Sequence, residues 1–412
     1  MTMINSPKPE FGLLSGLRVI MIGLSVAAPF AGELYAEHGA DVIWIENPKA
    51  VDSARVARKG GSWQQDRRNM RSLTMNYRSE KGKEAFLRLI STTDVLIEAS
   101  VGGSFDRAGL SDEVLWQANP GLIIAHISGF GQTGSPEYVK RASYDPIAQA
   151  FGCVMRMNGV EGLPSMPAMP FPGDYSAAFY AFGMSLAALY KRHQTGKGES
   201  IDIAQYELMI RLQANYPTDY LRYGLDYVKE GPHSLICAGY GTYKCADGNE
   251  IYTLLLGAGA VERGLKVLGL EYGSEDFPAG STLVPINTPA GDKLEAALQE
   301  YFSSHTAQEV EEAFCAARVP CSRLMNYEQA KVNPQYMARE VFTTWTAADG
   351  KTLIPGVNVM PKLARNPGRI WRGAPNVGMD NEDILSQLGY SDGEIKEMYE
   401  QGILDRKEYF EP

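Results

Sequence analysis

The chain has little cysteine and little histidine, and both shortages exclude kinds of site. Five cysteines are spread over 412 residues, and no two of them form a Cys-x-x-Cys pair. A disulfide framework and a cysteine-rich zinc site are therefore disfavoured, and reduced thiols in the cytoplasm are the expectation. The five histidines form neither an HExxH motif nor a pair four residues apart, so we expect no metal site.

Long apolar runs and an excess of positive charge are also missing. No apolar run reaches the roughly 18 residues of a membrane-spanning helix, and the opening MTMINSPKPEFG does not resemble a secretory signal. Asp and Glu number 49 against 39 Lys and Arg, which gives a formal net charge of -10. Nucleic acid and anionic membranes are therefore not expected as partners, while a local basic pocket for an anion stays possible.

The first 130 residues alternate between strand and helix patterns. Apolar, β-rich runs predict strands at 18–22, 41–46, 94–98 and 121–127. Helical patterns lie between them at 29–38, 79–92 and 111–118. This alternation is typical of a parallel sheet, so the sequence predicts an α/β fold with a large doubly wound, Rossmann-like domain.

A strong helical pattern at 174–193 extends this domain. Lys191, Arg192 and His193 suit its last turn, Gly196 and Gly198 end it, and a strand at 199–204 and a helix at 205–215 follow. Near residue 228 the pattern changes to a hairpin at 239–256, turning at Asp247-Gly248, and then to short helices at 260–268, 291–303 and 307–317. We therefore expect a large domain at 1–227, a small α+β domain at 228–330 and a C-terminal segment at 331–412, with one helix at 381–401.

Two glycine-rich motifs resemble phosphate-binding loops without matching them fully. Residues 129–134 fit GxGxxG after a strand, but Ser135-Pro136 does not open a clean helix, so nicotinamide binding is disfavoured and a loop that approaches another ligand is preferred over a plain turn. Residues 195–198 (TGKG) end a helix, which favours a C-cap. No GxSxG is present, which disfavours a serine hydrolase of the usual kind.

Asp174 stands at the start of the strongest helix, after Pro-Phe-Pro-Gly at 170–173. From spacing alone a helix N-cap is favoured, because Asp is a preferred capping residue. The same position also suits catalysis. The positive helix end should keep the carboxylate ionised, and a carboxylate can act as a covalent nucleophile.

Motifs over nearly the whole chain then point to a family. In order, they are GLRVIMIGLSVAAPFAGELYAEHGADVIWIE from 16, RRNMRSLTMN from 67, SGFGQTG from 128, SYDPIAQA from 143, GDYSAAFYA from 173 and TGKGESIDIA from 195. Together they resemble the family III (CaiB/BaiF) CoA-transferases. Four further segments resemble the carnitine CoA-transferases within that family: IEAS at 97–100, DEVLWQ at 112–117, YKCADG at 243–248 and MPKLARNPGRIWRGAPNVGMD at 360–380.

The resemblance implies an assembly and a mechanism. Two chains would form an interlocked homodimer, and a connection of low secondary structure such as 340–380 would serve the wrapping. Asp174 matches the catalytic aspartate, which passes through an anhydride and an aspartyl-CoA thioester. The partners would be an acyl-CoA, used as co-substrate, and a small carboxylate. No permanently bound cofactor would be needed.

The resemblance also assigns contacts to CoA. The matching positions are Val26, Ala27, Arg71, Arg107, Ser128, Gly129, Phe130 and Gly131. Two departures stand out. Val101 replaces a basic residue of the relatives, so that phosphate contact is either lost or supplied elsewhere, with Arg55 and Arg58 as the candidates. Gly257-Ala258-Gly259 is a weaker version of a glycine run that closes over the nucleophile in some relatives.

The function implied is transfer of CoA from crotonobetainyl-CoA or γ-butyrobetainyl-CoA to L-carnitine. Alternatives are the same chemistry on another acid, such as a bile acid or a dicarboxylate, an acyl-CoA racemase using His126 and Asp145, and a non-catalytic CoA-binding scaffold. Aromatic faces bind trimethylammonium groups well. The aromatic residues in suitable segments are Phe171, Tyr175, Tyr216, Tyr220 and Tyr223.

Overall fold

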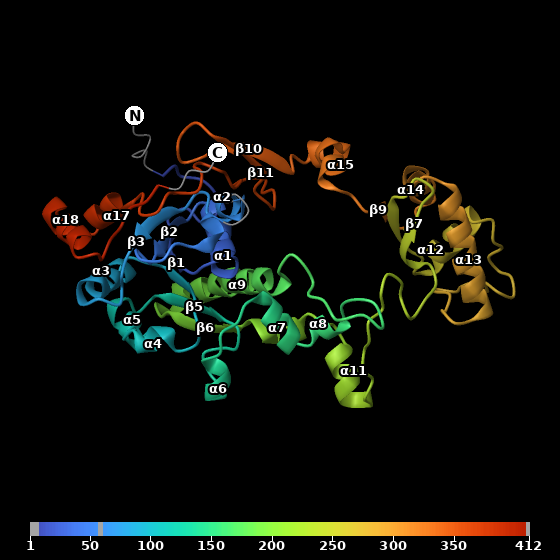
Figure 1. Cartoon of the computed structure of the whole chain (residues 1–412), viewed down its shortest axis with the longest axis horizontal. Coiled ribbons are helices and arrows are strands. Elements are labelled where there is room, and N and C mark those ends of the chain that lie inside the picture. The colour runs from blue at the N-terminus through green and yellow to red at the C-terminus, as the bar shows by residue number, and fades with distance from the viewer. Residues whose placement is uncertain (1–7, 57–60, 409–412) are drawn as a thin grey trace. The chain divides into compact units, whose positions relative to one another are not determined.

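The structure is a computed structural model that describes residues 8–56 and 61–408 (Figure 1). The chain divides into two compact units. Unit 1 is formed by the described parts of 1–155, 167–218 and 339–412, and unit 2 by 156–166 and 219–338. No helix of the described residues is long and apolar enough to span a membrane.

A six-stranded sheet forms the centre of unit 1. Its strands are β1 (Arg18–Ile22), β2 (Asp41–Glu46), β3 (Arg71–Thr74), β4 (Val95–Ala99), β5 (Ile123–Ser128) and β6 (Glu199–Ala204). Every neighbouring pair is parallel, and the order is β3-β2-β1-β4-β5-β6. The α/β prediction is confirmed. The direction of winding reverses between β1 and β4, and ligands bind at such a switch point in open α/β sheets.

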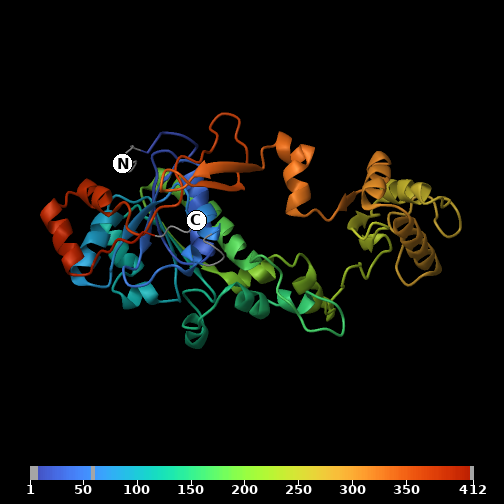
Figure 2. The ribbon, with the colours of Figure 1, turned by 45° about the horizontal axis from the view of Figure 1, so that its top comes forward.

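Helices cover both faces of this sheet because its strands are apolar on both sides. Val19 and Met21 pack with α1 (Ala27–Glu37) and α9 (Pro172–Thr195), which lie side by side (Figures 1 and 2). Ile20 packs on the other face, with α3 (Glu80–Ile90), α5 (Asp112–Ala118), α17 (Asn381–Gln387) and α18 (Asp392–Glu400). Continuous apolar strands of this kind are buried on both faces.

Shorter elements complete the chain. They are η1 (Ser53–Arg55), α2 (Gly61–Asp66), α4 (Ser104–Arg107), α6 (Pro136–Val139), α7 (Asp145–Phe151), α8 (Val154–Met157), α10 (Gln205–Arg211), α11 (Tyr216–Tyr223), α15 (Tyr327–Val332) and α16 (Pro334–Ala338). The expected C-cap after α9 is confirmed, because Gly196 has φ +69° and its N–H donates to the Arg192 carbonyl.

One prediction for the C-terminal segment is wrong. The single helix expected at 381–401 is two helices, because Gly389 has φ +84° and Ser391 caps α18 with its side chain. The connection at 340–380 has little secondary structure, as expected, apart from an antiparallel hairpin of β10 (Phe342–Thr346) and β11 (Leu353–Val357). Thr and Trp residues in β10 favour a strand at that place.

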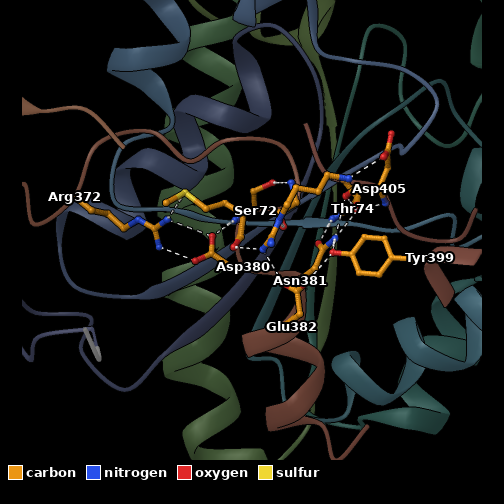
Figure 3. A network of polar contacts seen from close by, with 11 residues as sticks. Ser72, Thr74, Arg372, Asp380, Asn381, Glu382, Tyr399 and Asp405 are labelled. Atoms are coloured by element: carbon orange, nitrogen blue, oxygen red, sulfur yellow. Dashed lines mark hydrogen bonds and ion pairs between the residues drawn. The ribbon is translucent and has the colours of Figure 1, made fainter. Parts of the chain in front are cut away.

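The C-terminal segment covers the free edge of β3 (Figure 3). The Asp380 carboxylate accepts the N–H of Ser72 at 2.8 Å, and the Asp380 N–H donates to the Ser72 carbonyl at 3.0 Å. The Asn381 side chain accepts the N–H of Thr74 at 2.9 Å. These contacts satisfy edge groups that a seventh strand would otherwise bind. The tail at 360–380 thus ends at the residues that cover this edge, and we call the contacts of Asp380 and Asn381 with β3 the seal on β3.

Unit 2 has its own small sheet and core. The strands β7 (Tyr240–Lys244), β8 (Glu250–Leu254) and β9 (Cys321–Arg323) are antiparallel. Their apolar side chains pack with α12 (Ala258–Val267), α13 (Pro289–Ser304) and α14 (Ala307–Ala316). The predicted hairpin turn is present, with Gly248 at φ +78° between β7 and β8.

Candidate active site

A pocket of about 250 Å³ lies in unit 1, at the carboxyl ends of β1, β4 and β5. Its walls are the segments that follow these strands, together with a stretch before α7 and the starts of α9 and α10. The lining residues include Leu24–Ala27, Ala99–Gly102, Ile127–Phe130, Val139, Arg141–Tyr144, Asp174 and Gln205. This is the switch point of the sheet, where an α/β protein is expected to bind its ligand.

Buried polar contacts hold the walls of the pocket in place. Behind the loop after β1, Arg67 is fully buried and its Nη2 donates to the Ser25 carbonyl at 2.7 Å and to Asp52 at 2.6 Å. In the loop after β5, the Gly131 N–H donates to the Ser128 hydroxyl at 2.8 Å. Gly131 has φ +89°, a conformation that favours glycine. Both loops are therefore pre-formed.

Asp174 is the third residue of α9 and is 8% exposed. Its Oδ1 accepts a hydrogen bond from Gln205 Nε2 at 2.5 Å, and both residues line the pocket. The N-cap position is Phe171, which makes no side-chain cap. Instead, Asp145 Oδ1 accepts the N–H groups of Gly173 at 2.6 Å and Asp174 at 3.2 Å. The capping interpretation of Asp174 is therefore wrong, and its carboxylate faces the pocket.

Burial raises the pKa of Asp174 to about 6, and the negative charge of Asp145 adds to the rise. The hydrogen bond from Gln205 acts in the opposite direction. Burial thus outweighs the helix N-terminus, which we expected to favour ionisation. At neutral pH the group is still mostly ionised. A desolvated carboxylate of raised basicity is well suited to attack a carbonyl carbon.

The predicted CoA contacts fall into two groups. Val26, Ala27, Ser128, Gly129 and Phe130 line the pocket together with Asp174. The other predicted contacts lie outside this lining.

Of these, Gly131 holds the loop, as described. Arg107 donates from Nη1 to the carbonyl of the pocket-lining Gly102 at 3.1 Å. Arg71 begins β3, so it lies at the amino edge of the parallel sheet, whereas the pocket lies at the carboxyl edge. Its guanidinium binds Asp41 at 2.6 Å and Asp383 at 3.0 Å.

The predicted aromatic residues are divided between the two units. Phe171 and Tyr175 flank Asp174 at the start of α9, and the Tyr175 ring packs edge-on against Phe30 of α1 with centroids 4.8 Å apart. Tyr216 begins α11 in unit 1. Tyr220 and Tyr223 belong to unit 2 and are exposed.

Comparison with known proteins identifies the family. The model of CoA-transferase family III matches residues 14–381. The chain belongs to this family. It is therefore a transferase that uses a CoA thioester and a carboxylate.

Solved structures agree with this assignment. A CaiB/BaiF family protein from Brucella suis is 26% identical, with a TM-score of 0.77, over 92% of this chain and 100% of its own. The Mycobacterium tuberculosis protein Rv3272 shares the fold at 23% identity, with a TM-score of 0.78 and the same coverage.

Gln205 and Arg141 are among the pocket residues of this transferase that sequence reasoning missed. Gln205 follows β6 directly, and its place at the carboxyl end of a strand was a usable signal. Arg141 lies between the glycine loop and the SYDPIAQA motif, and its guanidinium sits 5.3 Å from the centre of the Phe130 ring. Within residues 8–56 and 61–408, no carboxylate pairs with Arg141. A cation in this position is available to an anionic ligand.

Of the two arginines expected to replace the contact missing at Val101, the structure describes only Arg55, which is engaged elsewhere in the fold. Val101 itself lines the pocket. Arg55 is buried, binds Glu46 at 2.6 Å and donates to the Pro375 carbonyl at 2.9 Å. Its donors are therefore occupied within the fold. Arg58 lies outside the described residues.

His126 and Asp145, the acid–base pair considered for a racemase, both bind other groups of the protein. His126 Nδ1 lies 2.6 Å from Glu98, and Nε2 lies 3.0 Å from Asp112. These hydrogen bonds and charges outweigh burial and raise the pKa of His126 to about 10. The imidazolium is therefore protonated at neutral pH and cannot accept a proton. Asp145 binds backbone N–H groups, as described.

Proposed function

We propose that this transferase moves CoA from crotonobetainyl-CoA or γ-butyrobetainyl-CoA to L-carnitine, with Asp174 as the nucleophile. The observation that carries the proposal is the Asp174 carboxylate, which is buried, raised in pKa and directed into the pocket at the switch point. One of its oxygens is held by Gln205, so the other is available for attack.

The reaction then has four steps in which every charge is accounted for. An oxygen of Asp174 attacks the thioester carbonyl, the C–S bond breaks, and CoA thiolate leaves a mixed anhydride. The thiolate attacks the Asp174 carbonyl carbon and expels the donor acid, which forms an aspartyl-CoA thioester. The acceptor carboxylate attacks that thioester and expels thiolate. The thiolate attacks the acceptor carbonyl of the second anhydride, which releases acyl-CoA and restores Asp174.

Both anhydrides and the thioester are sensitive to water, so burial of the nucleophile serves the chemistry. Val26, Ala27 and the loop Ser128–Phe130 would line the thioester arm of CoA, because they share the pocket with Asp174. Arg141 would bind a phosphate of CoA and replace the contact missing at Val101. Arg107 remains a proposed phosphate contact beside Gly102. We leave Arg71 out, since two carboxylates occupy it at the other edge of the sheet.

A positively charged acid is favoured by the surroundings of Tyr175. Burial raises the pKa of its phenol to about 12, and the negative charges of Asp66 and Glu33 contribute. Burial also raises the pKa of Asp66 to about 6, so this group is mostly ionised at neutral pH, with Arg67 Nη1 3.6 Å away, whereas burial raises the pKa of Glu33 well above its ordinary value. Aromatic rings beside negative charge suit a trimethylammonium group. Other carboxylic acids of the alternative reading lack this match.

A substrate panel tests the proposed substrates. CoA exchange is measured from crotonobetainyl-CoA to L-carnitine, γ-butyrobetaine, cholate and succinate. Preference for the two trimethylammonium acids supports the proposal. Preference for cholate or succinate would replace the substrate and leave the chemistry intact. Hydroxylamine added with acyl-CoA tests the chemistry itself, because only an activated carboxyl forms a hydroxamate, and we expect it at Asp174.

We also propose that two chains form an interlocked homodimer in the cytoplasm. Unit 1 is built from three separate chain segments, and α9 exposes the apolar side chains of Phe179, Tyr180, Met184 and Tyr190. Large apolar side chains that lie exposed on one helix are typical of an interface. Interlocked rings cannot separate while folded, so ultracentrifugation on serial dilution should show dimer throughout. A reversible folded monomer would contradict the interlocking.

A further inference from the structure

We propose that Asp145 is the positioning residue of the nucleophile: it fixes the backbone at Asp174 from another helix, and its charge disfavours the free carboxylate relative to the acylated enzyme. The second part rests on the function proposed above. The first part stands on geometry alone.

Two side chains of helix α7 bind both ends of the segment 168–174, which carries the nucleophile. Asp145, which is 1% exposed, binds the N–H groups of Gly173 and Asp174 through Oδ1. Its Oδ2 accepts from Gln149 Nε2 at 2.5 Å. Gln149 in turn binds both backbone groups of Ala168, at 2.8 and 2.9 Å. The segment 168–174 is therefore tied to one buried pair of side chains.

The local backbone requires this support. Phe171, a residue with a side chain, has φ +119° and ψ 59°, a left-handed conformation that costs free energy. At Gly173 an added Cβ would lie 2.8 Å from Asp145 Oδ1, so the Asp145 carboxylate lies close against the Gly173 backbone. Since Phe171 supplies no cap, Asp145 satisfies the first N–H groups of α9. This arrangement frees the Asp174 side chain for the pocket.

Among the described residues, Asp145 forms no ion pair, and the cation that lines the pocket with Asp174 is Arg141. The partners of Asp145 are backbone N–H groups and an amide. Around Asp174, the loops after β1, β4 and β5 bring no charged side chain, α10 brings the neutral Gln205, and the segment before α7 brings Arg141 and the Tyr144 phenol. Attack by Asp174 turns its anion into a neutral anhydride, so repulsion by Asp145 is relieved as the acyl-enzyme forms.

The test without substrate is a set of thermal unfolding curves at pH 5 and pH 8. The substitution Asp174→Asn is made in three backgrounds, which are the wild type, Asp145→Asn and Gln149→Ala. In each background, the Tm of this variant is compared with the Tm of the protein that keeps Asp174. In the wild-type background we expect the gain in Tm from Asp174→Asn to grow with pH. In the Asp145→Asn background, which keeps an oxygen for capping, the Tm gain should increase less between pH 5 and pH 8. Gln149→Ala is the matched control, because it weakens the binding of segment 168–174 and keeps the charge, so the growth should be unchanged.

Equal growth in all three backgrounds would overturn the electrostatic role of Asp145. If Asp145→Asn does not fold, Asp145→Ser provides a shorter oxygen acceptor and takes its place. These curves need no turnover, so they stand even if Asp174 is not the nucleophile.

The test with substrate follows hydroxamate formation at Asp174 with crotonobetainyl-CoA. We expect the acid limb of the rate profile to move to lower pH in Asp145→Asn and to stay in Gln149→Ala. Asp145→Ala should lower kcat about 100-fold with little change in KM, as expected for a displaced nucleophile. An unmoved limb in Asp145→Asn would refute the proposal. Absence of label at Asp174 in the wild type would instead refute the proposed function.

Discussion

Replacing the nucleophile by its amide, Asp174→Asn, should stabilise the protein while it abolishes turnover. The folded pKa of Asp174 is about 6 against an ordinary 3.8, a difference of about 2 units. At 1.36 kcal/mol per unit, the ionised group costs about 3 kcal/mol of folding free energy above pH 6. Asparagine has the same size and no charge, and its oxygen can still accept from Gln205.

The sign of the pH dependence follows from this difference. As pH rises, the unfolded chain releases the proton near pH 3.8, and the folded chain releases it only near pH 6. Stability is therefore lost across that window and stays low above it. Asp174→Asn should match the wild type below pH 4 and exceed it by about 3 kcal/mol at pH 7.5. A helix cap replaced by Asn would show no such gain.

The assays are chemical unfolding at several pH values and CoA exchange at pH 7.5. We expect exchange to fall by several orders of magnitude, because an amide does not attack a thioester. Wild-type protein with acyl-CoA and borohydride should lose a carboxyl only at Asp174. Near-normal exchange in Asp174→Asn, or a label on another carboxylate, would refute the mechanism. Equal stability at pH 7.5 would refute the account of its burial.

Three further predictions concern residues around the site. Arg141→Ala should raise KM for acyl-CoA about tenfold, equivalent to roughly 1.4 kcal/mol, with a smaller rise for dephosphorylated CoA if Arg141 binds the 3′-phosphate; equal KM values for wild type and variant would exclude the contact. The imidazolium of His126 should stabilise the fold fully below pH 6.5, and this stabilisation, up to about 5 kcal/mol, should vanish as pH rises through 10. In His126→Gln that alkaline loss should be absent from unfolding curves, and its persistence would contradict the assignment. Asn381→Ala should cost about 1–3 kcal/mol in urea unfolding, because the Thr74 N–H loses its partner, and an unchanged midpoint would show that water replaces it.

Much of the fold could be predicted because it depends on local pattern. The runs at 18–22 and 41–46 have continuous apolar cores, VIMI and VIWI, and the structure places both strands at those residues. Strand β3 was not predicted from its own pattern, because RSLT is short and polar and its edge partners come from the far end of the chain. The break between α17 and α18 depends on one glycine in a left-handed conformation, which residue periodicity does not show.

The site was only partly predictable for a similar reason. Asp174 and the glycine loop stand in recognisable motifs, so the sequence could point to them. The capping role passed to Asp145, which is 29 residues earlier, and no local rule reveals such a contact. The place of Arg71 follows from a local rule. A residue that begins a parallel strand lies at the amino edge, away from ligands that bind at the carboxyl edge.

The seal on β3 gives the synthesis of this protein an order in time. Asp380 binds Ser72 across 308 residues, and Asn381 binds Thr74 across 307. While the chain leaves the ribosome, the first five strands can form and β3 still presents bare N–H and C=O groups along its outer edge. Such edges pair readily with other chains. The sheet is thus completed only by the last tenth of the polypeptide, and a chain stopped before residue 380 would emerge with an adhesive side.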